Sequence, residues 1–500
     1  MVVTTTNGPV AGLRFEGGES FASIPFAAPP VGPLRFAPPR PPRAWTDVRD
    51  CSAPGPWAPQ AKGTLDTMFN GSPAPQSEDC LALTVTTPAC DDARRQVMVY
   101  VHGGAFVTGS PNVPWYRGNS FARRGIVTVN VSYRLGALGF ADLGTLSEDP
   151  RFATTGNNGL LDIIAGLEWV RDNIAAFGGD PEQVTIFGES AGGCAVISLM
   201  AMPAARGLFH RAIAQSPSVT QIRTRAQSRM WAERWLEALR VDDPIAALSC
   251  TADEILAAQA TVLDTTDPAR FEAFSPTIGT PQLPVHPLEA FASGLAPQLP
   301  LIVGTNADEM QLFAVLDPTH HAIDNDELIR RTSAYVGGAA SQLVSAASAH
   351  WPTLTPPALW SRLGTDWTFR RPAQTVAADH VGPTWVYEFH WPTPVFGGLL
   401  GSCHALEIPF AFNTLDAAGI ELFTGAGEER LPLAERMNGA WAAFATNSDP
   451  NHPGLVDHWP QFDRQRRSTY VFDTTDRRVD DPDAPVRTAW DAVLASAAAK

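Results

Sequence analysis

Two adjacent residues in the segment GSCHALEIPF, Cys403 and His404, have side chains that could take part in catalysis or metal binding. A cysteine beside a histidine could be a thiol nucleophile with its base, two ligands of a metal ion, or one base next to an inert thiol. The chain contains eleven histidines, so the choice of this one needs support from other residues. The segment alone leaves these alternatives open.

A serine supplies the second candidate. Ser190 stands in GESAG (188–192), which has the Gly-x-Ser-x-Gly pattern of a nucleophile elbow. The pattern by itself is weak, because a glycine-rich turn looks the same. Here an apolar strand, residues 184–188, precedes it, and the small residues Cys194 and Ala195 follow where a helix would open. A strand, a tight turn and a helix lift a serine Oγ clear of a sheet, so we predict that Ser190 is the nucleophile.

A serine nucleophile that attacks an acyl carbon needs N–H donors for the oxyanion, each contributing roughly 3–4 kcal/mol. The run VYVHGGAF (99–106) ends a predicted strand in two glycines, whose backbone can approach a substrate closely. We predict that the donors are the N–H groups of Gly103, Gly104 and Ala191. His102 is predicted to shape this loop.

These residues need a sheet to position them. Short apolar, β-branched runs predict strands, and helical spacing of apolar residues predicts a helix over 160–174. The strands are expected at 96–101, 126–134, 184–188 and 299–306. Strands separated by helices favour an α/β fold with a mostly parallel sheet covered on both faces. We expect one domain over 1–500, with helical, lid-like excursions at about 221–275 and 322–380.

Composition excludes several classes of function. Lys+Arg 36 against Asp+Glu 52 gives a net charge of −16, which argues against nucleic-acid and anionic-membrane partners. No run of about 18 apolar residues predicts a membrane span, and no basic start followed by an apolar stretch predicts a signal peptide. The six cysteines are sparse and form no Cys-x-x-Cys pair, so a reduced, cytoplasmic protein is expected.

Several ordered motifs resemble the type-B carboxylesterase family, which includes cholinesterases and bacterial p-nitrobenzyl esterases. The resemblance covers roughly residues 3–475 and rests on SIPFAAPPVGPLRF (23–36), SEDCLALTV (77–85), YRLGALGF (133–140), NIAAFGGDPEQVTIFGESAGG (173–193), GTNADE (304–309) and HALEIPFAF (404–412). It implies an α/β-hydrolase fold and hydrolysis of carboxylic esters through an acyl-enzyme on Ser190. It implies no metal and no cofactor.

The acid of the triad is expected at the end of a strand after Ser190, since α/β-hydrolases order their triad Ser, acid, His. The run ending at residue 306 is followed by Asp308 and Glu309, and spacing cannot separate the two. The resemblance favours Glu309, because the family's acid is the second carboxylate of an R/K-D-E-G segment. Ala307 and Met310 stand here in place of the basic residue and the glycine.

The base is expected downstream of that acid, in a loop. His404 has this position and matches the family's H-x-x-E-[IL]-P-F, with Glu407 as the partner that shapes its loop. Because Ser190 already fills the nucleophile's place, Cys403 is predicted to be a packing residue.

The resemblance carries further implications. It implies two buried ion pairs, Arg35–Glu78 and Arg134–Asp162, and a role for Ser216 in holding the triad acid. The usual partner of Cys80 in a disulfide is replaced by Ala58; Cys51 is nearby and could substitute, but a free thiol is the simpler interpretation. Five aromatic residues near the motifs are candidates either for an apolar substrate gorge or for the ordinary core: Phe106, Trp115, Tyr116, Phe313 and Phe396.

Three functional alternatives remain at this point. The first is a serine carboxylesterase for small to medium hydrophobic esters, with a small molecule as its partner and a monomer or small homo-oligomer as its state. The second is a catalytically silent scaffold protein of the same fold, although such proteins usually lose the serine, which is kept here. The third keeps the chemistry but acts on lipids, carbamates, or toxin or polymer esters.

Overall fold

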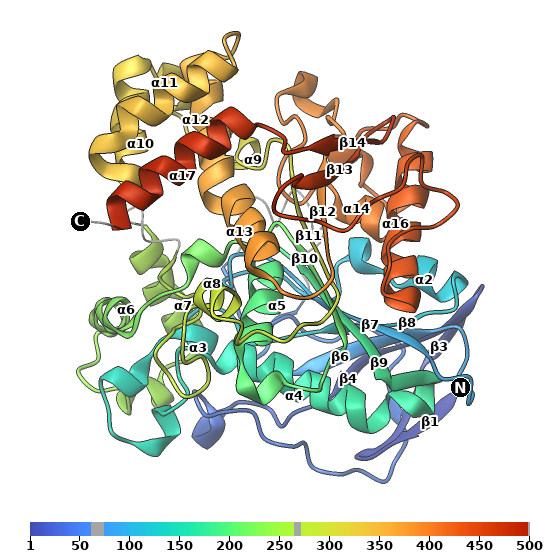
Figure 1. The fold of residues 1–500 in the computed structure, drawn as a ribbon. Helices are drawn as coiled ribbons and strands as arrows, with labels where there is room; N and C mark the ends of the chain where they lie inside the picture. Colours follow the sequence, from blue (N-terminus) through green and yellow to red (C-terminus); the bar gives the residue numbers. More distant parts are fainter. Residues whose placement is uncertain (62–74, 265–271, 499–500) are drawn as a thin grey trace.

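A computed structural model gives the fold of residues 1–61, 75–264 and 272–498 (Figure 1). The predicted, mostly parallel sheet is confirmed: within these residues it has eleven strands, and those from β8 to β13 pair in parallel. Its order is β14 (Arg477–Asp480), β13 (Ser468–Phe472), β12 (Thr384–Phe389), β11 (Leu301–Asn306), β10 (Arg211–Gln215), β9 (Gly179–Glu189), β7 (Arg95–Val101), β8 (Val127–Val131), β6 (Ala82–Thr87), β4 (Gly18–Pro25) and β3 (Leu13–Phe15). A small second sheet contains β1 (Val2–Thr5), β2 (Gly8–Ala11) and β5 (Arg49–Asp50).

Helices cover both faces of the large sheet, which explains why its central strands read as unbroken apolar runs. In β7, Val97 and Val99 point into one core and Met98 and Tyr100 into the other, as alternation along a strand requires. The first core packs α3 (Gly136–Phe140), α4 (Asn158–Asn173), α5 (Ala191–Ala201), α6 (Arg225–Leu239), α7 (Ala252–Leu263), α8 (Pro287–Ala292) and α13 (Arg371–Asp379). The second packs α2 (Asn119–Arg123), α9 (Gln311–Ala314), α14 (Ile408–Ala411), α15 (Glu421–Thr424) and α16 (Arg430–Asn447).

Both predicted excursions are helical where the structure describes them. The first contains α6 and α7; residues 265–271 of it lie outside the described residues. The second contains α10 (Asn325–Val336), α11 (Ala340–His350), α12 (Pro356–Thr365) and α13. Helices α10 to α12 share a third apolar cluster with the C-terminal helix α17 (Ala484–Ala498), and the four lie together in Figure 1.

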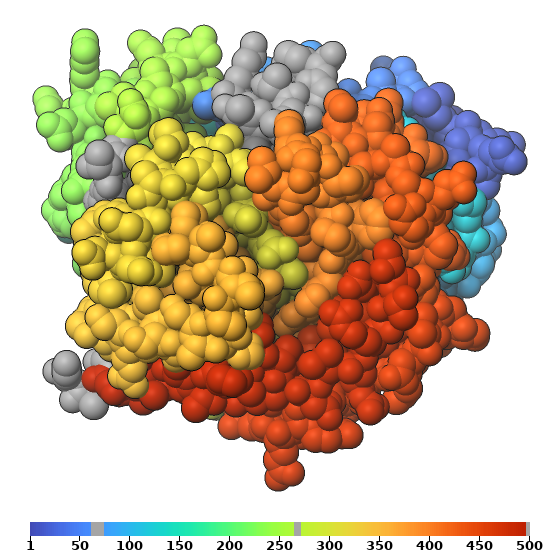
Figure 2. Space-filling model, turned by 90° about the horizontal axis from the view of Figure 1, so that it is seen from above, coloured from blue at the N-terminus to red at the C-terminus, as the bar shows by residue number. Residues whose placement is uncertain are grey.

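The surface is hollowed between the yellow helices of the second excursion and the orange segment that follows β12 (Figure 2). The carboxyl ends of β11 and β12 lead into the chain segments beside this hollow. In the described part of the chain, no helix is both long and apolar enough to cross a membrane.

Candidate active site

The three residues predicted to form a triad all follow strands of the parallel part of the sheet. Ser190 follows β9, Glu309 lies in the turn after β11, and His404 lies in the segment after β12. The carboxyl ends of parallel strands meet at one edge of a sheet, where open α/β folds bind their ligands. The topology therefore brings together three residues that are far apart in the sequence.

Ser190 occupies a strained turn between β9 and α5. Its φ is 59° and its ψ is −120°, a conformation that non-glycine residues rarely adopt. The backbone N–H of Ser190 donates to the carbonyl of Gln215 (2.9 Å), which ties the turn to β10. A Cβ at position 192 would lie 2.0 Å from the carbonyl oxygen of Val101, so only glycine lets α5 approach β7 this closely. The predicted elbow is present.

His404 joins the serine and the acid in one hydrogen-bonded chain. The distance from His404 Nε2 to Ser190 Oγ is 2.8 Å, and that from His404 Nδ1 to Glu309 Oε2 is 2.6 Å. Both lie within the range for proton transfer between a nucleophile, a base and its orienting acid. His404 and Glu309 are buried, while Ser190 is partly exposed. A reagent from solvent therefore meets the serine first.

Glu309 and Asp308 have separate environments, a difference that spacing could not predict. Glu309 Oε1 accepts hydrogen bonds from the Ser216 hydroxyl (2.6 Å) and the Asn306 N–H (2.7 Å), which leaves Oε2 for the imidazole. Asp308 instead accepts from the N–H of Ser402 (3.0 Å). Only Glu309 is aimed at His404, and the implied contact between Ser216 and the acid is confirmed.

Glu407 anchors the loop that carries His404. Its carboxylate accepts hydrogen bonds from the Gln215 side chain (3.0 Å) and the Asn306 side chain (2.7 Å). The Asn306 amide also donates to the carbonyl of Cys403 (2.7 Å). Asn306, at the end of β11, therefore ties both Glu407 and the residue before His404 to the sheet. This agrees with the prediction that Glu407 shapes the loop of His404.

Cys403 is buried in the second core and is a free thiol. Burial raises the pKa of the Cys403 thiol well above its ordinary value, so the reactive thiolate is not formed at neutral pH. Cys403→Ser is expected to keep most of the esterase activity and to lose about 1–2 kcal/mol of stability, because a hydroxyl replaces the thiol in an apolar site. His404→Ala is expected to be nearly inactive. Both are measured by kcat for a p-nitrophenyl ester and by thermal unfolding; an inactive, folded Cys403→Ser variant would overturn this interpretation.

The predicted oxyanion donors lie beside the serine. A Cβ at position 103 would lie 3.1 Å from the Ser190 Cβ, so the Gly103 backbone is in contact distance of the nucleophile. Gly104 has a φ of +110°, which a side chain would oppose. Ala191 is the first residue of α5, so its N–H has no acceptor within that helix.

His102 shapes the loop of the predicted oxyanion donors, as expected. It is buried, stacks on Tyr133 with ring centroids 4.4 Å apart, and its Nδ1 is hydrogen-bonded to the carbonyl of Gly103 (2.8 Å). Burial lowers the pKa of His102 to about 4, so the ring is neutral.

Glu189 is a neighbour of the histidine that sequence reasoning did not identify, although it is the second residue of GESAG. Its Oε1 lies 3.2 Å from His404 Nε2, the same nitrogen that contacts Ser190. Burial raises the pKa of Glu189 to about 8. Burial also lowers the pKa of His404, but the nearby carboxylates of Glu189, Glu309 and Glu407 outweigh this and raise it above its ordinary value. Because the two groups interact directly, their protons leave in two coupled steps that belong to the pair.

Glu189→Gln is expected to move the acid limb of the kcat/KM profile to lower pH by about one unit. The base must be neutral to accept the Ser190 proton, so activity falls as pH drops through the pKa of His404. Removing the Glu189 charge lowers that pKa, and the variant should keep a larger share of its activity on the acid side. The measurement is kcat/KM for a soluble ester across about pH 5 to 10, a range that includes the raised pKa of His404. An acid limb that does not move, or that moves to higher pH, contradicts the expected coupling.

Three of the five candidate substrate aromatics are packed in the interior. Phe106 has no exposed surface and lies in the first core. Trp115 is buried in the second core and stacks on Phe423, with ring centroids 5.4 Å apart. Tyr116 is half-buried and packs against Tyr100. Their surroundings favour packing over contact with a substrate.

The other two candidates are exposed, and one lies at the triad. Phe313 is 36% exposed and its ring centroid lies 5.5 Å from that of His404. Phe396 is more exposed (56%) and has a φ of 52°. A residue that the sequence did not single out, Phe369, lies nearer to His404 than Phe313 does, at 4.5 Å between ring centroids. An apolar surface therefore flanks the imidazole.

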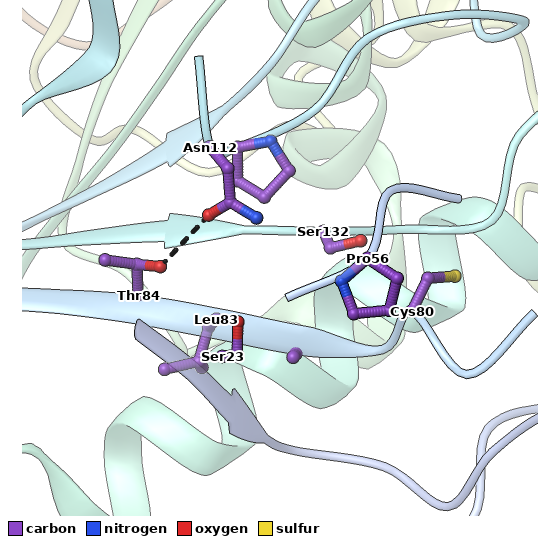
Figure 3. A pocket seen from close by; sticks show the side chains of 9 residues that line it. Ser23, Pro56, Cys80, Leu83, Thr84, Asn112 and Ser132 are labelled. Carbon is purple, nitrogen blue, oxygen red and sulfur yellow. Dashed lines mark hydrogen bonds between the residues drawn. The ribbon is translucent and has the colours of Figure 1, made fainter. Parts of the chain in front are cut away.

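Both implied ion pairs are formed; burial is confirmed for the second, whereas Glu78 of the first is half-buried. Arg35 and Glu78 are 2.5 Å apart, and Arg134 and Asp162 are 2.7 Å apart and buried. A small pocket elsewhere in the protein is lined by Ser23, Pro56, Cys80, Ala82, Leu83, Thr84, Pro111, Asn112 and Ser132 (Figure 3). It contains no triad residue. Cys80 and Cys51 are both free thiols, as the simpler interpretation required.

An α/β-hydrolase sheet with a serine, a histidine and a carboxylate hydrogen-bonded at its carboxyl edge defines an enzyme of the serine hydrolase class. The family model described as "Carboxylesterase family" matches residues 1–487. The chain belongs to the carboxylesterase family, and it is a carboxylic ester hydrolase that takes a small-molecule ester as substrate.

The chain is similar to relatives along almost its entire length. It is 36% identical to para-nitrobenzyl esterase of Bacillus subtilis (strain 168), covering 97% of each chain. It is 34% identical to fumonisin B1 esterase of Sphingopyxis macrogoltabida, covering 93% of this chain and 85% of that one. Among solved structures, a carboxylesterase of Geobacillus stearothermophilus has a TM-score of 0.89 at 36% identity, covering 98% of this chain and 99% of that one.

Proposed function

We propose that the chain hydrolyses small to medium hydrophobic esters through an acyl-enzyme formed on Ser190. The single observation that carries the proposal is the hydrogen-bonded chain Ser190–His404–Glu309, with its contacts of 2.8 and 2.6 Å. His404 Nε2 accepts the serine proton while Oγ attacks the ester carbonyl, and Glu309 stabilises the imidazolium. The N–H groups of Gly103, Gly104 and Ala191 stabilise the oxyanion.

Deacylation repeats these steps with water as the nucleophile. His404 first gives its proton to the leaving alcohol oxygen, which completes the acyl-enzyme. It then accepts a proton from a water molecule that attacks the acyl carbon, and returns that proton to the Ser190 Oγ as the acid leaves. Every proton in the cycle moves at His404 Nε2, and no step needs a metal or a cofactor.

A hydrophobic substrate is supported by the rings beside the imidazole. Phe313, which is 36% exposed, presents apolar surface with its ring centroid 5.5 Å from that of His404, and the buried ring of Phe369 packs on the same imidazole at 4.5 Å. Burial of apolar surface contributes about 25 cal/mol per Å², which favours longer alkyl groups until the space is filled.

A panel of p-nitrophenyl esters with increasing acyl length tests the proposal. The expected result is a maximum of kcat/KM at a short or medium chain. A maximum at long chains would favour a lipase, and no turnover of any ester by the folded protein would favour a silent scaffold. Phenmedipham and fumonisin B1 belong in the panel, because relatives of 34% identity are named for hydrolysis of these compounds.

We also propose that residues 1–500 form one domain, with the excursions at 221–275 and 322–380 as its cap, and that the protein is a cytoplasmic monomer or small homo-oligomer. The six free cysteines support a reducing compartment. Light scattering of the purified protein measures the oligomeric state.

A further inference from the structure

The helical run from α12 to α13, residues 356–379, contains a π-helical turn at Asp366–Arg370. A π-turn is rare, and within α-helices it occurs frequently at functional sites. This one interrupts an otherwise regular run between Thr365 and Arg371. It lies far from the triad in the sequence, yet two consecutive residues of the turn contact the surroundings of His404 and Glu309.

Arg370 holds the backbone that leads into the acid. Its Nη2 donates to the carbonyl oxygens of Asn306 (3.3 Å) and Ala307 (3.0 Å). Arg362, from α12, donates to the same Ala307 carbonyl (2.8 Å). The carbonyls belong to the residues two and three positions before Glu309, and no residue from 306 to 311 is itself basic. Positive charge reaches this turn from the helical run.

The same helical run also holds the far side of the turn. The backbone N–H of Met310 donates to Thr365 Oγ1 (3.2 Å), and the Ser361 hydroxyl donates to the Gln311 side chain (3.0 Å). Glu309 is therefore fixed on both sides by one element. The turn has little freedom to rotate the carboxylate away from His404.

The charge of Arg370 is balanced by carboxylates that are not part of the triad. Asp366 Oδ1 lies 3.0 Å from Nη1 of Arg370, and Glu388 Oε1 lies 3.5 Å from its Nε. All three side chains are at most 6% exposed. A buried guanidinium is tolerated only when it is paired, so the two carboxylates keep the cation where its remaining donors reach the turn.

Phe369, the residue before Arg370, contacts the histidine that pairs with Glu309. Its ring lies 4.5 Å from the imidazole of His404 between centroids, tilted by 33°, and it is buried. The Phe369 ring limits rotation of the His404 imidazole about the Cβ–Cγ bond of the histidine. One turn of helix thus contacts both the turn of the acid and the base.

We propose that the π-helical turn Asp366–Arg370 is a positioning device for the acid–base pair, in which Arg370 fixes the backbone before Glu309 and Phe369 fixes the plane of His404. The proposal rests on the proposed function, because it requires Glu309 and His404 to act as acid and base. Arg370 and Phe369 are positioning residues, since neither exchanges a proton in the reaction.

Arg370→Lys tests the proposal. Lysine keeps a cation near Asp366 and Glu388, but its single nitrogen cannot pair with these carboxylates and also reach the two carbonyls, as separate nitrogens of Arg370 do. A small displacement of a reacting group can lower a rate by about 100-fold, and we expect kcat to fall about tenfold with KM within twofold. The acid limb of kcat should move to lower pH, since a displaced Glu309 raises the pKa of His404 less. Arg371→Lys is the matched control: Arg371 is the next residue, pairs with Asp491 on α17, and should leave kcat and the acid limb unchanged.

Two further measurements separate positioning from folding. Titration with a covalent p-nitrophenyl phosphonate counts reactive serines, so kcat is expressed per active site. Proton NMR detects the downfield proton between His404 and Glu309, which should move upfield in Arg370→Lys. If Arg370→Lys does not fold, Phe369→Leu is measured instead, with an expected loss in kcat of about fivefold and a change in the same resonance.

The outcomes distinguish this proposal from the proposed function. If Glu309→Gln kept the kcat of the wild type, Glu309 would not be the acid, and the proposed function would fail. If Glu309→Gln is inactive while Arg370→Lys and Phe369→Leu keep the wild-type kcat per active site, acid limb and NMR resonance, the π-turn is only structural and this inference alone is overturned.

Discussion

Ser190→Ala is expected to lower kcat for ester hydrolysis by about 10⁵-fold or more, with a folded protein and little change in KM. Alanine removes the only atom that attacks the ester carbonyl. It keeps the Cβ, so the strained backbone at this position (φ 59°) is neither relieved nor made worse. His404 then has no proton to accept, and the oxyanion donors can act only on direct attack by water.

The measurement compares kcat and KM for p-nitrophenyl butyrate with thermal unfolding of the same preparations. Ser198→Ala is the matched control, since Ser198 is a buried serine eight residues further along the same segment of chain, in α5. It should retain the wild-type kcat. Substantial hydrolysis by folded Ser190→Ala would mean that another residue is the nucleophile, and the proposed acyl-enzyme would be wrong.

The sequence predicts the parts of the site that depend on special backbone geometry. The strand, tight turn and helix around Ser190 need small residues at fixed positions, and these remain visible in GESAG (188–192). The same holds for the two glycines at 103 and 104. Chain order then restricts the base to residues downstream of the acid, which is how His404 is found. Those predicted positions lie together in the structure.

The choice of acid could not come from spacing. Asp308 and Glu309 are adjacent carboxylates after the same strand, and their roles differ only in direction: one side chain meets Ser402, the other His404. That direction is set by the turn from Asn306 onward, which is held by α12 and the π-turn. Contacts of this kind depend on tertiary packing and leave no periodic signal in the sequence.

Phe369 and Arg370 were missed for the same reason. Both lie in a segment correctly predicted to be helical, and one extra residue in a helical turn changes which neighbours its side chains meet without changing composition. Seven of the described strands in the large sheet also escaped the sequence analysis: β3, β4, β6, β10, β12, β13 and β14. Of these, β3 and β14 lie at the edges and are short and polar, so they lack the apolar pattern of covered strands.

Glu309→Gln is expected to lower kcat by about 10⁴-fold, which is the second large effect at this site. Glutamine has nearly the same shape, and its carbonyl can still accept from Ser216 and Asn306. Its amide nitrogen would then face His404 Nδ1 as a donor, which favours the wrong tautomer of the imidazole and removes the charge that stabilises the imidazolium. The acid limb of the residual activity should move to lower pH, because Glu309 is one of the carboxylates that raise the pKa of His404.

Asp308→Asn decides whether this effect belongs to the acid or to any carboxylate in the turn. The asparagine carbonyl can still accept from the Ser402 N–H, so the turn should persist and kcat should stay within about threefold of the wild type. The two variants remove one carboxylate charge each from adjacent residues, and only one of those charges lies 2.6 Å from the imidazole. Equal losses of kcat would show that negative charge anywhere in the turn matters more than the hydrogen bond between Glu309 and His404. A larger loss in Asp308→Asn would make Asp308 the acid.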